Sequence, residues 1–188
     1  MESCRTGSVN QLSAILKTNS MIHQKPIIYQ LLPRLFTNYC TTPVVGGTLQ
    51  QNGSGKLNDI NSTILGAIRD LGATHVWYTG IIEHAHDVDY TSYGISRQNP
   101  HIVKGKAGSP YAICDYYDID PDLAVDVPGR MAEFEALVDR THEAGLKVII
   151  DFVPNHVARQ YHSDAKPAGI EDFGTGDNHE MFFECWHS

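Results

Sequence analysis

Short apolar runs alternate with amphipathic segments along this chain, and this alternation constrains the fold more than any other feature. Residues 26–32 form a short apolar run, residues 58–72 repeat apolar side chains at helical spacing, and residues 74–78 form a second apolar run. A strand, a helix and a strand in succession predict two parallel strands joined by a right-handed crossover. We therefore expect an α/β fold whose strands are covered on both faces.

The same pattern recurs further along the chain. Residues 131–145 predict a second helix that ends at a glycine, and residues 147–153 predict a third strand. A closed barrel and an open doubly wound sheet both fit this order, and both gather ligands at the carboxyl ends of their strands. The first strand is not followed by a G-x-G-x-x-G pattern, which disfavours a dinucleotide-binding fold.

Composition narrows the classes of partner. The net charge of −8 makes nucleic acid an unfavourable partner, and no apolar run is long enough to span a bilayer. Residues 1–24 contain no secretory apolar core, so we expect a cytoplasmic protein. The four cysteines are too widely spaced for a zinc site and too few for a disulfide scaffold, so we interpret them as reduced thiols. They are Cys4, Cys40, Cys114 and Cys185.

Residues 79–128 form a connection that is too long to be an ordinary loop, and loops of this size usually have a function of their own. Histidine and aspartate gather near its start, at His84, His86, Asp87 and Asp89. Their spacing is not typical of a zinc site. We therefore interpret this stretch as a solvated polar turn.

Three segments match a known pattern in the right order. Residues 151–156 read Asp-Phe-Val-Pro-Asn-His at the end of a strand, residues 71–78 lead into the second strand, and Tyr111 precedes the acidic and aromatic residues 115–121. Together, over about residues 27–160, they resemble the alpha-amylase family of glycoside hydrolases. The resemblance implies a partial (β/α)8 TIM-type barrel, consisting of its first three strands and their helices.

The resemblance also implies an organisation of the chain into three parts. Residues 1–25 would be an N-terminal extension, and residues 26–156 would be the N-terminal portion of the catalytic domain. Residues 157–188 would begin the subdomain that follows the third strand. Because a (β/α)8 barrel typically needs about 250 residues, the chain is expected to be a truncated form of the domain.

Site residues follow from the resemblance position by position. Tyr111 would be the aromatic platform under a bound sugar, and His156 would donate hydrogen bonds to hydroxyls of the same sugar. Asn155 would be a calcium ligand, with Asp115 and Asp151 as supporting carboxylates that orient their neighbours. The alternatives are a core tyrosine, a histidine that caps the strand end by bonding to backbone, and, for both aspartates, a buried hydrogen-bonded carboxylate, which is nearly the same as the supporting role.

Two carboxylates that the family's chemistry requires are missing. Retaining hydrolysis needs a nucleophile and an acid about 5 to 5.5 Å apart. In the family the nucleophilic Asp follows a Gly-x-Arg-x motif on the fourth strand, and the acid is a Glu that ends the fifth strand. Neither segment occurs here, because Gly129-Arg130 lacks the spacing and precedes the third strand.

Two functions therefore stay open. The full-length parent would be a glycosidase or transglycosidase that acts on alpha-linked glucans. Alternatively, the chain is a non-catalytic fragment that at best binds oligosaccharide weakly. A nucleotide-binding α/β protein is disfavoured because no phosphate loop is present. The sequence fixes neither the glucan nor the oligomeric state.

Overall fold

A three-stranded parallel sheet lies at the centre of the computed structural model, which describes residues 25–173. Strands β1 (Ile28–Leu31), β2 (His75–Tyr78) and β5 (Lys147–Ile150) pair in the order β1-β2-β5, and both pairings are parallel. Ile28 lies opposite His75, which lies opposite Lys147. The predicted parallel strand–helix–strand arrangement is thus confirmed.

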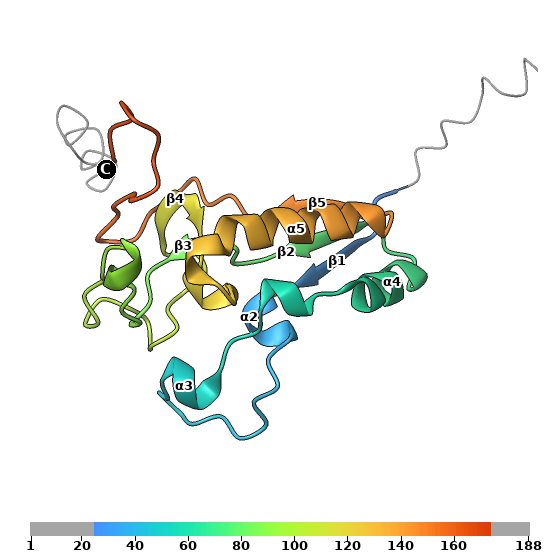
Figure 1. Cartoon of the computed structure of the whole chain (residues 1–188), viewed down its shortest axis with the longest axis horizontal. Helices are drawn as coiled ribbons and strands as arrows, with labels where there is room; N and C mark the ends of the chain where they lie inside the picture. The colour runs from blue at the N-terminus through green and yellow to red at the C-terminus, as the bar shows by residue number, and fades with distance from the viewer. Residues whose placement is uncertain (1–24, 174–188) are drawn as a thin grey trace, which may run out of the picture.

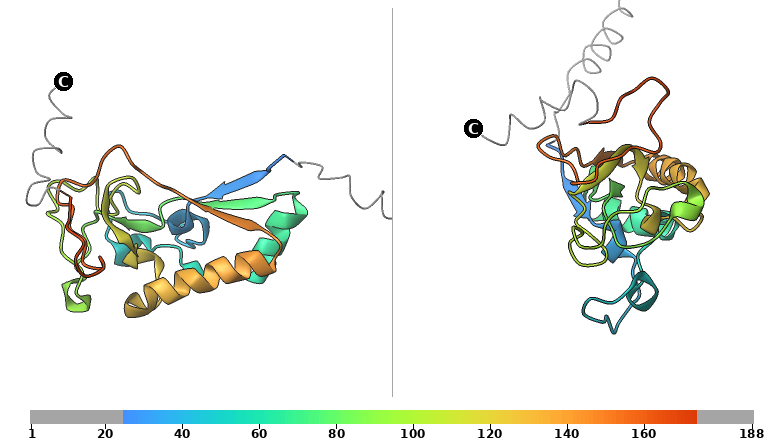
Figure 2. Two further views of the ribbon diagram at one scale, coloured as in Figure 1. Left: turned by 90° about the horizontal axis from the view of Figure 1, so that it is seen from above. Right: turned by 90° about the vertical axis from the view of Figure 1, so that its left-hand side faces the viewer.

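Two helices return the chain between these strands. They are α4 (Ser62–Asp70) and α5 (Arg130–Glu143), and both lie on the same face of the sheet (Figures 1 and 2). The side chain of Asn61 accepts hydrogen bonds from two backbone N–H groups in the first turn of α4 and so caps it. Helix α4 begins later than the pattern predicted, because residues Leu57–Asp59 form a separate 3₁₀ turn.

The hydrophobic core fills the space between the sheet and these two helices. Leu57, Leu65, Val76 and Leu137 are completely buried within it. Leu71, which the helical spacing placed on the buried face of the first helix, is instead 75% exposed. The reason is that α4 ends at Asp70, before the chain turns into β2.

A buried hydrogen-bond chain joins β2 to α5. The hydroxyl groups of Tyr78 and Thr141 lie 2.6 Å apart, and Thr141 Oγ1 donates to the backbone oxygen of Leu137 at 2.7 Å. Since the single hydroxyl proton of Thr141 is engaged by Leu137, Tyr78 is the donor to Thr141. All three residues are fully buried, so the polar groups satisfy one another without water.

The other face of the sheet is uncovered within residues 25–173. By the strand register this face carries Ile28, Trp77 and Ile149; Ile28 is 47% exposed, and neither Trp77 nor Ile149 is buried. The expectation of strands covered on both faces is therefore wrong for the described residues, because both helices pack on a single face (Figure 2).

The long connection after β2 contains an antiparallel hairpin that the sequence pattern did not predict. It pairs β3 (Ile82–His84) with β4 (Ile113–Ile119), and Glu83 lies opposite Asp115. Gly108 packs against this hairpin with a positive φ of 69°, and a Cβ there would lie 1.7 Å from the backbone oxygen of Ala85. The close approach therefore requires glycine.

The remaining elements are short. Helices α2 (Pro33–Phe36) and α3 (Leu49–Asn52) lie in the connection between β1 and α4. No helix within residues 25–173 is long and apolar enough to cross a lipid bilayer. Cys40 and Cys114 are free thiols, as expected, and the other two cysteines lie outside the described residues.

Candidate functional site

The segments that follow β2 and β5 meet at the carboxyl ends of the sheet. Asp151 comes directly after β5 and accepts a hydrogen bond from Trp77 Nε1 at 2.6 Å. Its second oxygen accepts from the backbone N–H of Gly80 at 3.2 Å. One carboxylate thus fixes the end of β2 against the end of β5, which is the geometry that a supporting role requires.

Backbone contacts bring the stretch containing Tyr111 beside the stretch containing His156. The N–H of Ala158 donates to the oxygen of Ile113 at 2.7 Å, and each of these residues lies two positions beyond a predicted sugar contact. The hydroxyl of Tyr116 donates to the backbone oxygen of Val153. The two predicted substrate-binding residues therefore belong to segments that run side by side.

The side chains of Tyr111 and His156 are both accessible to a ligand. Tyr111 is 46% exposed, which contradicts the alternative of a core tyrosine. His156 is half-buried, and its Nδ1 lies 3.0 Å from Asn155 Oδ1. Because an amide oxygen can only accept, Nδ1 is the donor in this contact, and Nε2 has no contact with Asn155.

Asp115 fastens a distant segment to the hairpin. It is fully buried and accepts hydrogen bonds from Ser163 Oγ at 2.6 Å, from the N–H of Tyr117 at 2.7 Å and from the N–H of Ala165 at 3.0 Å. The carboxylate therefore holds residues 163–165 against β4. This position also fits the predicted supporting role.

The role of Asn155 as a calcium ligand stays a prediction. Its side chain is exposed and contacts His156. Among residues 25–173, two groups of three His, Cys, Asp or Glu side chains could hold a metal ion, and they are described below. Because calcium takes about 6 to 8 oxygen ligands, one amide oxygen is not sufficient.

The interior of the hairpin is ionic. His84 and Asp120 are both buried, and His84 Nδ1 lies 2.6 Å from Asp120 Oδ2. Burial disfavours the charged imidazole, but the Asp120 carboxylate outweighs this effect and raises the pKa of His84. The interpretation of this stretch as a solvated polar turn is therefore wrong for His84 and His86, because both are buried and the chain directly after β4 brings Asp120 and Asp122 beside them.

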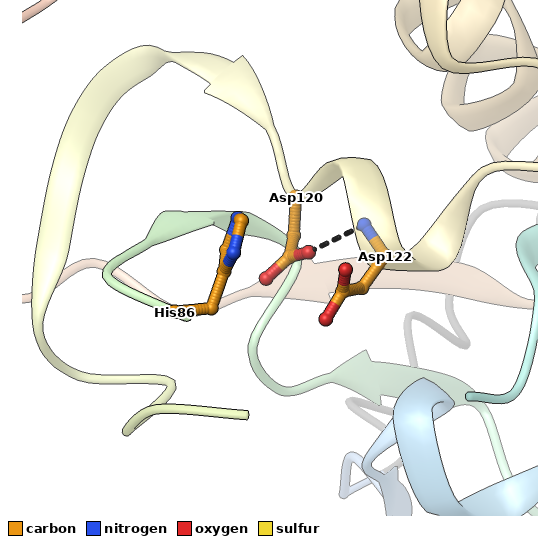
Figure 3. Close-up of side chains that lie close together, drawn as sticks. All are labelled: His86, Asp120 and Asp122. Carbon is orange, nitrogen blue, oxygen red and sulfur yellow. Dashed lines mark hydrogen bonds between the residues drawn. The ribbon is translucent and has the colours of Figure 1, made fainter. Parts of the chain in front are cut away.

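The first of the two possible metal groups consists of His86, Asp120 and Asp122 (Figure 3). The N–H of Val88 donates to His86 Nδ1 at 3.2 Å, so the proton of the neutral ring lies on Nε2. Asp122 accepts a hydrogen bond from the hydroxyl of Tyr90 at 2.8 Å. His84 is the ion-pair partner of Asp120, although among the described residues Asp120 Oδ2 has no hydrogen-bond donor.

The second group consists of Glu83, Asp115 and Asp118, all of them buried. Arg130 pairs with Asp118 through two hydrogen bonds, one of 2.8 Å from Nε. Burial raises the pKa of Glu83 to about 8, and the neighbouring carboxylates add to this rise. Sequence reasoning missed Glu83 and Asp118, and the only signal for them was the density of acidic residues from 115 to 122.

Comparison with known proteins identifies the family. The model of the alpha-amylase catalytic domain matches residues 30–181. The chain belongs to the alpha-amylase family. The resemblance drawn from three short segments is thereby confirmed, and membership implies a partial (β/α)8 barrel, which the parallel strands and their helices fit.

Individual relatives extend well beyond the matched region. The chain is 29% identical to Maltase 1 of Drosophila virilis over 151 residues, which cover 78% of this chain and 18% of that protein. It is 25% identical to the cyclomaltodextrin glucanotransferase of Geobacillus stearothermophilus over 85% of this chain and 21% of that protein. A solved alpha-amylase from Lactobacillus plantarum is 30% identical, with a TM-score of 0.48, over 72% of this chain and 24% of that one. The chain thus spans about a fifth of the length of these relatives.

Proposed function

We propose that this chain supplies the N-terminal part of a glycosidase that acts on alpha-linked glucans, by retaining hydrolysis or by transglycosylation. The observation that carries the proposal is the family match across residues 30–181, together with the side-by-side arrangement of the Tyr111 and His156 segments. Relatives named as a maltase and a glucanotransferase support alpha-linked glucose as the substrate class.

In this proposal, β1, β2 and β5 are the first three strands of the barrel. Residues 26–156 form the N-terminal portion of the catalytic domain, preceded by an extension at residues 1–25 and followed by the start of a subdomain at residues 157–188. The parallel order β1-β2-β5 supports this assignment, because successive barrel strands are neighbours.

Tyr111 would form the sugar platform, and His156 would hydrogen-bond to hydroxyls of the same sugar. An exposed phenol ring offers a flat apolar face for the sugar, while Nε2 of His156 offers a polar contact beside it. Asp151 and Asp115 would keep the two segments in place through the contacts described above.

We further propose that the 188-residue chain alone is inactive and binds oligosaccharide only weakly. The recognisable motifs include neither the nucleophile nor the acid that retaining hydrolysis requires. The non-catalytic reading therefore describes the isolated chain, whereas the glycosidase reading describes the complete catalytic domain.

Calorimetric titration of the chain with maltoheptaose tests the binding role. Loss of one stacking ring is worth about 1 kcal/mol, so Tyr111→Ala should weaken binding about fivefold. Tyr39→Ala is the matched control, because Tyr39 is 82% exposed and lies in the connection between β1 and α4. Equal affinities for the wild type and the Tyr111→Ala variant would refute the platform role, and turnover of the glucan by the purified chain would refute its inactivity.

A further inference from the structure

Three buried carboxylates meet inside the β3–β4 hairpin. Glu83, Asp115 and Asp118 each offer an oxygen within 4.8 Å of the other two. Their exposed fractions are 2%, 0% and 4%. Burying an ionised carboxylate destabilises the fold unless a nearby positive charge compensates it. The positive charges around these three residues therefore show whether they need a further partner.

The charge of this group is only partly compensated. Arg130 is the cation that pairs with the group in the described part of the chain, through Asp118. Three carboxylates and one guanidinium leave a net charge of −2 if every group is ionised, and −1 while Glu83, whose pKa burial raises to about 8, holds a proton. A divalent cation that displaces this proton would neutralise the fully ionised group.

Hydrogen bonding leaves one oxygen without a donor. Within residues 25–173, Glu83 Oε2 is buried and has no hydrogen-bond partner. The other oxygen, Oε1, accepts only from the thiol of Cys114 at 3.2 Å, and a thiol is a weak donor. Glu83 is therefore a buried carboxylate whose capacity to accept is almost unused.

The two aspartates retain acceptor capacity as well. Asp115 accepts three hydrogen bonds. Asp118 accepts two from Arg130 and one from the N–H of Ile119. Because a carboxylate has about four lone-pair sites, each aspartate has one left for an ion beside Glu83.

We propose that Glu83, Asp115 and Asp118 bind one hard divalent cation, of the class of Ca²⁺, Mg²⁺ or Mn²⁺, inside the β3–β4 hairpin. The ligands are all carboxylate oxygens, which such cations prefer. The site is separate from any calcium bound by Asn155, and it does not depend on the glycosidase proposal. The ion joins β3 to β4 and, through Asp115, to residues 163–165.

The neighbouring group of His86, Asp120 and Asp122 provides a contrast within the same hairpin. There His84 compensates Asp120, Tyr90 donates to Asp122, and the available nitrogen of His86 already carries a proton. Asp120 Oδ2 also lacks a hydrogen-bond donor within residues 25–173, but its ion-pair partner His84 lies 2.6 Å away, so this group carries no such proposal.

Calorimetric titration of the EDTA-treated 188-residue chain with CaCl₂, MgCl₂ and MnCl₂ tests the site. We expect at least one of these ions to bind saturably, with one ion per chain. Loss of a partner outside the ligand shell typically weakens metal binding about 10- to 100-fold, so Glu83→Gln should weaken it at least about tenfold. Glu143→Gln, which changes an exposed carboxylate on α5, should leave the affinity unchanged.

Asn155→Ala separates this site from the family's calcium ligand, and it should also leave the affinity unchanged. Absence of saturable binding for all three ions would overturn the proposal, as would binding that Glu83→Gln leaves intact or that Asn155→Ala abolishes. If Glu83→Gln does not fold, paramagnetic broadening by MnCl₂ in the wild type decides the question. The amide signals of Glu83, Asp115 and Asp118 must broaden before that of Asn155.

Discussion

The hydrogen-bond chain from Tyr78 through Thr141 to Leu137 allows a quantitative test of how α5 is held on the sheet. Tyr78 donates to Thr141, and Thr141 donates to the backbone of Leu137. The two side chains are therefore not equivalent. Removing the hydroxyl of Tyr78 leaves every remaining donor paired. Removing the hydroxyl of Thr141 leaves the buried hydroxyl of Tyr78 without an acceptor.

The expected costs differ accordingly. Tyr78→Phe removes one neutral hydrogen bond and should lower the free energy of unfolding by about 0.5–1.5 kcal/mol. Thr141→Val leaves the Tyr78 hydroxyl without a partner, which adds a desolvation penalty of about 1–3 kcal/mol. The double variant removes both polar groups and should be more stable than Thr141→Val alone.

Chemical denaturation of the four proteins, followed by circular dichroism, measures these differences as a double-mutant cycle. Contacting residues that share a network typically show a coupling of about 0.5–3 kcal/mol. The reasoning is refuted if Tyr78→Phe costs more than Thr141→Val, or if the two losses simply add. Either result would mean that the donor order in the chain is not the one described.

Two further predictions concern the hairpin. Gly108→Ala should lower the free energy of unfolding by about 2–5 kcal/mol, because the alanine is strained at a positive φ and its Cβ also clashes with the backbone oxygen of Ala85. At Gly105 the φ is positive but no atom lies near the new Cβ, so Gly105→Ala should cost only the backbone strain of about 1–2 kcal/mol. Equal losses in thermal unfolding would contradict the close packing. Arg130→Gln should lower the free energy of unfolding by about 3–5 kcal/mol, because it leaves the buried carboxylate of Asp118 without its cation. Arg69→Gln breaks an exposed ion pair with Asp70 and should lower it by less than about 1 kcal/mol. Denaturation curves that shift equally for both arginine variants would argue against a buried pair.

Sequence periodicity predicted the part of the fold that local patterns determine. The runs around Val76 and Val148 are apolar, and helices separate them from their neighbours, so a parallel sheet followed directly. The same reasoning placed Leu71 in the core, since periodicity alone does not show where a helix ends. Motif resemblance, not periodicity, indicated the family and located Tyr111 and His156.

The hairpin escaped prediction because its strands are far apart in sequence and its interior is polar. Glu83 and Asp115 pair across an intervening segment of about thirty residues, and neither belongs to an alternating apolar pattern. Charged residues are ordinarily expected at the surface, so burial of His84 with Asp120 contradicts the usual reading of such a stretch. Only the three-dimensional pairing shows that these charges compensate one another.

The ionic interior of the hairpin ties the stability of the chain to the composition of its surroundings. An apolar core responds mainly to temperature and denaturant, but a core of Glu83, His84 and several aspartates also exchanges protons with the medium. Two samples of this protein that differ only in pH, on either side of the raised pKa of Glu83, therefore have different free energies of unfolding. For this chain, a stated free energy of unfolding therefore needs the proton concentration at which it was measured.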